Sequence, residues 1–309
     1  MTNSGTHVTW REMVKRTQVE VSERTVAQWL CEHASGCDAD EFSGILDELV
    51  SERSAQHLHS MLSRYAAGEP LQYVMGRWAF RRLDLLVDSR VLIPRPETEL
   101  LVEHVTRYAL QKIRDVGRGV AIADLGTGSG AVGLSVLHEL PCESAEVWMT
   151  DVSEDALHVA RANAAGVGRN AVGARFGHGS WYEALPEDLR GSVDAIVSNP
   201  PYIATGDPLV GESVLKWEPH SALFAGKDGL NDLRLVISSA TDWLVPGGLL
   251  AVEMGFTQAN VVSQLFESAG FQRKGQIWQR NGMDCMPLMM AMDEFYAFLL
   301  QAYNESGNK

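Results

Sequence analysis

The most constraining feature of the sequence is an apolar run, 120–125 (VAIADL), that stops at the glycine-rich segment Gly126–Gly130 (GTGSG). A helical pattern of apolar residues begins directly after it, at 131–140. Glycines let the backbone turn sharply and let a ligand approach without a clash against Cβ atoms. A strand, a glycine-rich turn and a helix in this order predict an open α/β sheet with a ligand site at the turn.

From about residue 119 onward, short apolar runs alternate with helical patterns. The further runs that predict strands are 146–150, 171–176 (the weakest), 193–197 and 248–252. The further segments that predict helices are 153–165, 229–244 and 257–269. Because strands that are joined through helices pair in parallel, the sequence predicts a doubly wound parallel α/β sheet with helices on both faces.

The residues before this region follow other patterns. Residues 8–66 carry apolar side chains at spacings of three to four among polar ones, which predicts several short helices. Two short strands are predicted at 78–80 and 83–87, and a helix is predicted from Pro94 to about Gln111. We therefore expect three domains: a small all-α domain at 1–75, a connector with a β-hairpin and a helix at 76–118, and the α/β domain at 119–309.

The charge balance narrows the range of partners. Lys plus Arg number 26 against 40 for Asp plus Glu, so the formal net charge is −14. A chain this acidic has no overall attraction to phosphate backbones, so nucleic acid is a disfavoured partner unless a local basic patch exists. The sequence shows no signal peptide and no apolar stretch long enough to span a bilayer, so we expect a cytoplasmic protein without a membrane partner.

Cysteine and histidine spacing argues against a metal or disulfide site. The four cysteines form no Cys-x-x-Cys pair, and the nine histidines are dispersed along the chain. We therefore expect reduced thiols and no bound metal ion.

Two aspartates define the ligand expected at the glycine-rich turn. Asp151 lies about 21 residues beyond Gly130, at the end of the next strand, where a carboxylate can accept hydrogen bonds from ribose hydroxyls. Asp124 precedes the turn, where it would repel a pyrophosphate but suits an ammonium group, such as that of S-adenosylmethionine (SAM). Residues 128–133 also match the dinucleotide pattern G-x-G-x-x-G, so a dinucleotide site and a purely structural turn stay open as alternatives.

A second motif, Asn199-Pro200-Pro201-Tyr202, directly follows the strand region at 193–197. Ligand crevices in such sheets lie at the carboxyl ends of strands, so we expect this motif to face the glycine-rich turn. Consecutive prolines leave rigid carbonyl acceptors, and Asn199 adds a side-chain oxygen. Two fixed acceptors can hold both N–H bonds of a planar amide or amino group, with Tyr202 on its flat face. Holding that nitrogen in line with a methyl donor would accelerate methyl transfer.

Together these motifs resemble those of the protein-(glutamine-N5) methyltransferases, in particular the PrmC/HemK group that modifies class-1 peptide chain release factors. The similarity extends from about residue 68 to residue 270. The segments that carry it are 68–73 (GEPLQY), 93–99 (IPRPETE), 124–130 (DLGTGSG), Asp151, 199–202 (NPPY), 218–219 (EP), 228–230 (DGL) and 247–255 (GGLLAVEMG). NPPY alone is shared with adenine-N6 methylating enzymes, whereas its combination with IPRPETE is much more specific.

The resemblance implies a SAM-dependent Rossmann-like domain behind a helical domain that recognises the protein substrate. It implies SAM as donor, S-adenosylhomocysteine as product, and the release factor Gly-Gly-Gln glutamine as acceptor, methylated on its side-chain nitrogen (N5). The implied donor-binding residues are Asp124, Gly126, Thr127, Gly128, Ser129, Gly130, Asp151, Trp181 and Asn199. The implied glutamine-binding residues are Asn199, Pro200, Pro201 and Tyr202, of which Asn199, Pro200 and Tyr202 are the catalytic ones. A core position is the alternative for Trp181.

The C-terminal region 279–309 departs from the family, whose members commonly end in a strand with an Asp-x-x-x-x-Asp-Arg pattern. Here a Met-rich stretch precedes a predicted helix at 293–303. Three alternatives therefore stay open: a ribosomal protein glutamine as acceptor, adenine-N6 methylation of nucleic acid, and a catalytically silent binding protein. Arg95 either touches substrate or packs beside its prolines, and Glu253 either faces the cleft or packs. We expect a monomer.

Overall fold

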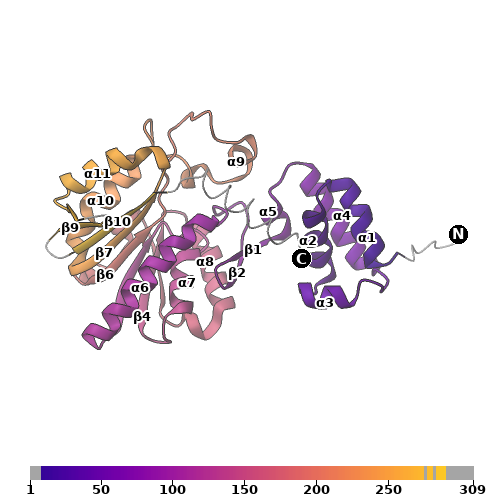
Figure 1. The fold of residues 1–309 in the computed structure, drawn as a ribbon, viewed down its shortest axis with the longest axis horizontal. Coiled ribbons are helices and arrows are strands. Elements are labelled where there is room, and N and C mark those ends of the chain that lie inside the picture. Colours follow the sequence, from indigo (N-terminus) through magenta and orange to yellow (C-terminus); the bar gives the residue numbers. More distant parts are fainter. Residues whose placement is uncertain (1–7, 275–276, 281–282, 290–309) are drawn as a thin grey trace. The chain divides into compact units, whose positions relative to one another are not determined.

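The chain divides into two compact units in a computed structural model that describes residues 8–274, 277–280 and 283–289 (Figure 1). One unit comprises the described residues up to Trp78 together with Glu212–Trp217. The other comprises Ala79–Gly211 and the described residues from Glu218 onward. The three domains expected from the sequence stay a prediction, and the helix expected at 293–303 lies outside the described residues.

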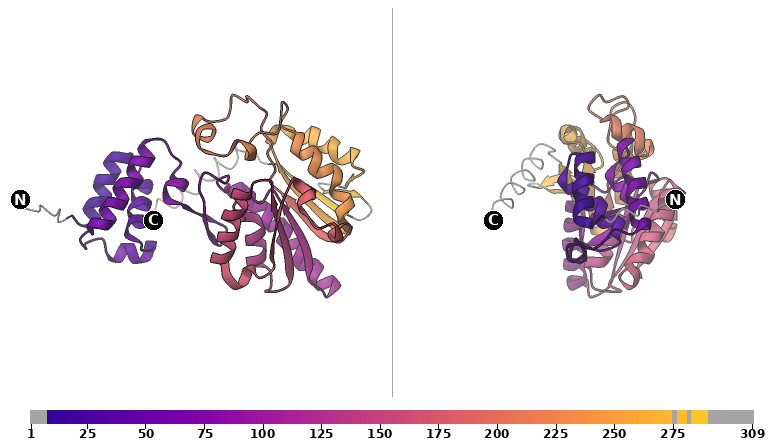
Figure 2. Two further views of the ribbon diagram at one scale, coloured as in Figure 1. Left: turned by 180° about the vertical axis from the view of Figure 1, so that it is seen from behind. Right: turned by 90° about the vertical axis from the view of Figure 1, so that its right-hand side faces the viewer.

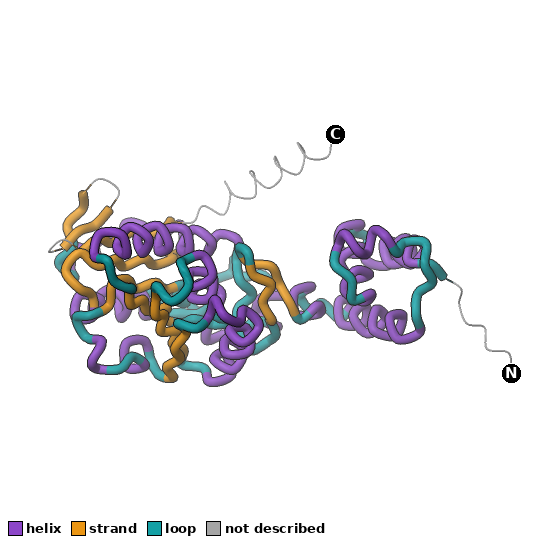
Figure 3. Tube along the Cα trace, turned by 90° about the horizontal axis from the view of Figure 1, so that it is seen from below, coloured by secondary structure: helices purple, strands orange, loops and turns teal. Residues whose placement is uncertain are grey.

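The first unit is built of helices joined by loops (Figure 3). Its helices are α1 (Trp10–Val21), α2 (Arg24–Ser35), α3 (Ala39–Gly44), α4 (Glu52–Ala66), α5 (Leu71–Met75) and α9 (Glu212–Trp217). The longest of them, α4, begins where the Ser51 hydroxyl accepts a hydrogen bond from the Ser54 N–H at 3.1 Å, which is the favoured N-cap arrangement. Leu30, Phe42 and Leu58 lie in the buried core of this first unit. The predicted short helices are confirmed.

An eight-stranded sheet forms the centre of the second unit, in the order β5-β4-β3-β6-β7-β10-β9-β8. Its strands are β3 (Val120–Leu125), β4 (Ala145–Asp151), β5 (Ala174–His178), β6 (Val193–Ser198), β7 (Leu244–Met254), β8 (Gln272–Lys274), β9 (Ile277–Arg280) and β10 (Met283–Met289). Every pair from β5 to β10 is parallel, whereas β9 pairs antiparallel with both β10 and β8. A separate two-stranded sheet contains β1 (Arg77–Phe80) and β2 (Leu83–Leu86).

Helices cover both faces of this sheet (Figure 2). They are α6 (Glu99–Val116), α7 (Ala131–Glu139), α8 (Glu154–Val167), α10 (Asn231–Trp243) and α11 (Ala259–Ser268). Side chains alternate between faces along a strand, and on β3 Ile122 joins the core with α6 and α7 while Ala123 joins the core with α10 and α11. Val197 and Ile196 of β6 divide in the same way. The predicted doubly wound α/β fold is confirmed.

Three element boundaries differ from the sequence expectation. The helix expected to end near Gln111 continues to Val116, because Gly117 is the first residue that turns left-handed, with φ of 69°. A 3₁₀ turn, Pro96–Thr98, precedes that helix. β5 begins at Ala174 because a second 3₁₀ turn occupies residues 168–171. β7 is longer than expected, since it includes the Pro246–Gly248 segment.

Candidate active site

One pocket of the second unit lies where the carboxyl ends of β3, β4 and β6 meet, as expected for an open parallel sheet. Its walls include the glycine-rich turn after β3 and the first part of the NPPY motif after β6. The other walls come from the segment before α6, the turns after β4 and β5, and residues 219–222. The polar, aromatic and turn residues of its lining include Arg90, Arg95, Thr98, Asp124, Gly126, Thr127, Gly128, Ser129, Asp151, Trp181, Asn199, Pro201 and Asp232.

The glycine-rich turn is held by backbone hydrogen bonds to the neighbouring strand. The N–H groups of Gly126 and Thr127 both donate to the Thr150 carbonyl at 2.8 Å. Gly128 follows with φ of 56°, a left-handed backbone conformation that residues with a Cβ rarely adopt. A Cβ on Gly128 would meet no atom within 4 Å, so its backbone borders open space in the pocket. A ligand can therefore lie directly against the turn.

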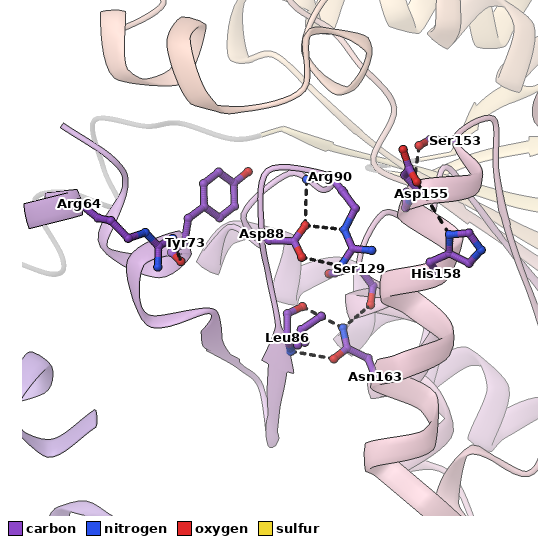
Figure 4. Close-up of polar contacts among 11 residues, drawn as sticks. Arg64, Tyr73, Leu86, Asp88, Arg90, Ser129, Ser153, Asp155, His158 and Asn163 are labelled. Atoms are coloured by element: carbon purple, nitrogen blue, oxygen red, sulfur yellow. Dashed lines mark hydrogen bonds and ion pairs between the residues drawn. The ribbon is translucent and has the colours of Figure 1, made fainter. Parts of the chain in front are cut away.

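Asn163 of α8 anchors the far side of this turn (Figure 4). Its Nδ2 donates to the Ser129 carbonyl at 2.9 Å and to the Leu86 carbonyl at 3.0 Å, and its Oδ1 accepts from the Leu86 N–H at 2.7 Å. All the hydrogen-bonding atoms of a buried side-chain amide are thus engaged, which makes the turn rigid. Sequence reasoning did not single out Asn163.

Asp124, at the end of β3, is a buried carboxylate that borders the pocket. Its Oδ2 accepts from the Thr127 hydroxyl at 2.6 Å and from the Gly133 N–H at 2.9 Å. Burial raises the pKa of Asp124 to about 6, although both hydrogen bonds lower it. A Cβ on Gly133 would lie 3.0 Å from Asp124 Oδ2, so glycine permits the close approach of α7. A cationic ligand group would favour the ionised form of this carboxyl.

Asp151 stands at the end of β4, beside the same turn. Its Oδ2 accepts from the Gly128 N–H and its Oδ1 from the Ser153 N–H, both at 2.9 Å. Burial raises the pKa of the carboxyl, and these backbone hydrogen bonds oppose that effect. Asp151 also lines the pocket, so its carboxylate can accept hydrogen bonds from a ligand.

Trp181 forms an aromatic wall beside the turn. It begins the 3₁₀ helix Trp181–Ala184 with φ of 45°, a conformation that is rare for a bulky residue and typical of functional sites. A Cβ on Gly126 would lie 3.4 Å from the indole ring, so the glycine lets this ring approach. A hydrogen bond from Trp181 lowers the pKa of the Asp232 carboxyl, which burial raises. Asp232, at the start of α10, had no signal in the sequence.

The NPPY motif divides between the pocket and the core behind it. Asn199 and Pro201 line the pocket, whereas Pro200 is buried and neither it nor Tyr202 belongs to the lining. The Tyr202 hydroxyl donates to Glu253 Oε1 at 3.1 Å, so Tyr202 is held by its phenol. Sequence reasoning placed Tyr202 on the flat face of the bound amide, and that role stays a prediction.

A buried hydrogen-bond chain connects Asn199 to Glu253. Asn199 Nδ2 donates to Thr98 Oγ1 at 3.1 Å, and Thr98 Oγ1 donates to Glu253 Oε2 at 2.7 Å. Thr98 is 4% exposed and Glu253 is 1% exposed. Burial raises the pKa of Glu253 to about 7, while the hydrogen bonds from Thr98 and Tyr202 lower it. The sequence left the role of Glu253 open and provided no signal for Thr98 beyond its place in IPRPETE.

Arg95 lines the pocket and is paired with Glu218, which follows α9 in the chain. The Arg95 Nη2 to Glu218 Oε1 distance is 2.6 Å, and Glu218 Oε2 accepts from the Ile93 N–H at 3.2 Å. Glu218 is 5% exposed. This pair ties the IPRPETE segment to the EP segment, so Arg95 has a structural partner in addition to its place at the pocket.

Within the ranges that the structure describes, no group of three or more His, Cys, Asp or Glu side chains could hold a metal ion. Among the described helices, none combines the length and the apolar character needed to cross a membrane.

Comparison with known proteins adds two matches to family models. The model described as "PrmC N-terminal domain" matches residues 10–76, and the one described as "Methyltransferase small domain" matches residues 96–216. A relative from Xylella fastidiosa named "Release factor glutamine methyltransferase" is 42% identical over 248 residues, which are 80% of this chain and 86% of the relative. Relatives with the same name from Burkholderia pseudomallei and Haemophilus influenzae are 40% and 34% identical and cover 79% and 83% of this chain, and 84% and 87% of their own lengths.

Proposed function

The chain belongs to the family of release factor glutamine methyltransferases, and from this premise we propose that its pocket joins a SAM site to a site for a release factor glutamine. The enzyme is a SAM-dependent methyltransferase that modifies the side-chain amide nitrogen of a glutamine. The proposal for the site rests on one observation: the glycine-rich turn, Asp151 and Asn199 line the same pocket. Donor-binding and amide-binding groups are therefore close enough to act on one reaction.

The donor half of the pocket fits an adenosine with an amino-acid tail. The Trp181 ring offers a flat apolar wall, and Asp151 retains acceptor capacity for ribose hydroxyls. Gly126–Gly130 presents backbone without side-chain obstruction, and Asp124 offers a carboxylate for an ammonium group. When bound, SAM supplies an electrophilic methyl group on a sulfonium centre, and S-adenosylhomocysteine is left as product.

The acceptor half holds a planar amide by its two N–H bonds. Asn199 Oδ1 and the Pro200 carbonyl are the acceptors we assign, because the two prolines make this backbone rigid. Hydrogen bonds to both amide hydrogens orient the amide nitrogen toward the methyl donor and hold it there, which is a positioning effect. The amide proton leaves to water after transfer, so no side chain is assigned as a general base. Pro201 forms a further part of the pocket wall, and Tyr202 lies outside the lining, where its hydroxyl donates to Glu253.

For the partner, we propose a class-1 release factor whose Gly-Gly-Gln loop enters the pocket. The helical unit, matched by the PrmC N-terminal domain, is the part we assign to recognition of that protein. A cytoplasmic monomer is consistent with this role, since release factors act in translation. The net charge of −14 disfavours nucleic acid as the acceptor.

The test is a transfer assay with radiolabelled SAM and three acceptors offered separately: a class-1 release factor, a ribosomal protein fraction and RNA. We expect label on the release factor, and no label on a release factor whose Gly-Gly-Gln glutamine is replaced by alanine. Label on RNA or on a ribosomal protein alone would reject the release factor. SAM binding without transfer to any acceptor would favour the silent binding protein.

A further inference from the structure

We propose that Thr98 and Glu253 are positioning residues that set the direction of the Asn199 side-chain amide, so that its oxygen faces the pocket. This inference rests on the proposed function, because it assigns that oxygen to the substrate amide. Thr98 contacts Asn199 from the turn before α6, and Glu253 contacts Thr98 from the end of β7, outside the pocket lining.

The hydrogen-bonding capacity of the groups leaves one arrangement. An ionised carboxylate only accepts, so the hydroxyls of Thr98 and Tyr202 must both donate to Glu253. Thr98 has one hydrogen, which points to Glu253 Oε2 at 2.7 Å, so its oxygen can only accept from Asn199. Asn199 therefore turns Nδ2 toward Thr98, at 3.1 Å, and Oδ1 is the atom that remains for the pocket.

The carboxylate that starts this chain is itself held in place. Glu253 is 1% exposed at the end of β7, and its two oxygens have different donors. Tyr202 holds one oxygen and Thr98 holds the other, so rotation of the carboxylate would break one of the two hydrogen bonds. A buried network with every donor matched to an acceptor specifies one conformation.

A reversed Asn199 amide would defeat substrate binding. Its NH₂ group would then face the NH₂ group of the glutamine, and two donors cannot form a hydrogen bond with each other. One of the two hydrogen bonds to the substrate amide would be lost, and a buried N–H donor would be left unpaired. The orientation of Asn199 thus distinguishes an amide nitrogen acceptor from a group that lacks hydrogens.

Ionisation of Glu253 is what makes the arrangement unique. Burial raises its pKa to about 7, Glu97 raises it further, and Thr98, Tyr202 and Arg95 lower it. These are the charged and titratable groups that face the carboxyl from the turn before α6 and from the loop after β6.

Protonation would release the constraint. A protonated Glu253 can donate to the Thr98 oxygen, and the Thr98 hydrogen is then free to point to Asn199 Oδ1. Both amide orientations become available, and the productive one loses population. We therefore expect kcat/KM for the protein acceptor to rise as the pH increases past about 7, where Glu253 loses its proton.

The test compares Thr98→Val, which removes the hydroxyl at nearly constant volume, with Thr98→Ser, which keeps it. Thr98→Val is expected to lower kcat/KM for the release factor by about 10- to 100-fold, the effect of one or two hydrogen bonds, with an unchanged Kd for SAM. Thr98→Ser is expected to recover most of that loss. Equal losses in both variants would assign the effect to packing at this position and not to the hydroxyl, and either that result or full activity in Thr98→Val would overturn the proposal.

Thr106→Val, on the helix that follows Thr98, provides the matched control. Thr106 is buried, and its hydroxyl has no hydrogen-bond partner among the described residues. The same substitution there is expected to leave kcat/KM and the Kd for SAM unchanged. A comparable loss in Thr106→Val would show that replacing any buried threonine in this region disturbs the enzyme, which would reject the specific role of Thr98.

A readout that does not depend on activity separates this inference from the proposed function. In ¹⁵N spectra, the Asn199 side-chain NH₂ resonance is assigned by its absence in Asn199→Asp. We expect its shift to titrate with a midpoint near 7 in the wild type and to lose that titration in Glu253→Gln. A resonance insensitive to pH in the wild type would reject the proposal, whether or not the release factor is methylated.

Discussion

Two buried carboxylates, Asp124 and Glu253, stand at the carboxyl ends of parallel strands on the two sides of the site. Burial raises the pKa of both, to about 6 and about 7. The partners of Asp124 are three and nine residues further along the chain, whereas those of Glu253 are 155 and 51 residues away. One carboxylate belongs to a local turn, and the other joins segments that only the fold brings together.

The two carboxylates therefore act on the pocket in different ways. Asp124 is held by the Thr127 hydroxyl of the adjoining turn and by the Gly133 N–H of α7, and it borders the donor half of the pocket directly. Glu253 does not line the pocket, and it acts on the amide half through side-chain hydroxyls. The donor half is therefore set by local backbone, and the amide half by a non-local network.

The largest expected effect is that of Asn199→Ala, which removes the amide half and leaves the donor half intact. We expect methyl transfer to fall by about 100-fold or more, because the acceptor nitrogen is no longer held in position. The Kd for SAM, measured by calorimetry, should change little. A loss of SAM affinity as large as the loss of transfer would show that the two halves are not separable.

The pH dependence of stability should distinguish the two carboxylates. Because each folded-state pKa is raised, the folded protein binds more protons than the unfolded chain, and the free energy of unfolding falls as pH rises. For Asp124 the fall lies between about 4 and 6, and for Glu253 between about 4.5 and 7. Each amounts to on the order of 3 kcal/mol, which is then constant at higher pH.

Urea unfolding at a series of pH values checks this expectation with Asp124→Asn and Glu253→Gln. Each variant should remove its own part of the slope, so that Glu253→Gln alone flattens the range from 6 to 7. Identical profiles for both variants would remove the distinction between the carboxylates. A wild-type profile that rises with pH over this range would contradict the raised pKa values.

A smaller effect is expected for Asp151→Ala, which probes the donor half alone. Its loss removes the acceptor assigned to the ribose and leaves the Gly128 and Ser153 N–H groups without their partner. We expect the Kd for SAM to rise by about 10-fold, equivalent to about 1.4 kcal/mol. At saturating SAM, kcat should be close to that of the wild type. A fall in kcat with an unchanged Kd for SAM would show that Asp151 acts in the acceptor half of the pocket and not in the donor half.

The smallest effect is expected for Trp181→Phe, which keeps an aromatic wall but removes the indole N–H that bonds Asp232. We expect the Kd for SAM to rise by only about threefold, since most of the stacking area remains. Trp181→Ala should have a clearly larger effect on the same Kd. Equal effects of the two substitutions would mean that the hydrogen bond, and not the ring, is what matters.

Sequence patterns predicted the local parts of the molecule well. β3 was predicted with its observed bounds, and the strands β4 and β6 to within a residue, because each is a short apolar run next to a turn signal. The turn after β3 and the NPPY motif were recognisable for the same reason, since all their residues are contiguous. Which donor or acceptor each side chain provides was a separate question that required the fold.

The non-local parts could not be predicted from patterns. The contacts of Thr98 and Asp232 involve residues that are distant in the chain, and neither contact leaves a spacing signal. The pairing of Arg95 with Glu218 spans 123 residues. Glu253 sits in an apolar strand, where a buried carboxylate is costly and needs partners, but the sequence could not say which. Only the fold supplied those partners.

The most direct test of the account is mass spectrometry of the release factor after incubation with the enzyme and SAM. We predict a gain of about 14 Da, one CH₂ unit, on the peptide that contains Gly-Gly-Gln, with fragment ions placing it on the glutamine. Acid hydrolysis of that peptide should release methylamine, because the methyl group is on the amide nitrogen. A methyl group on another residue, or methanol released from an ester, would contradict the account.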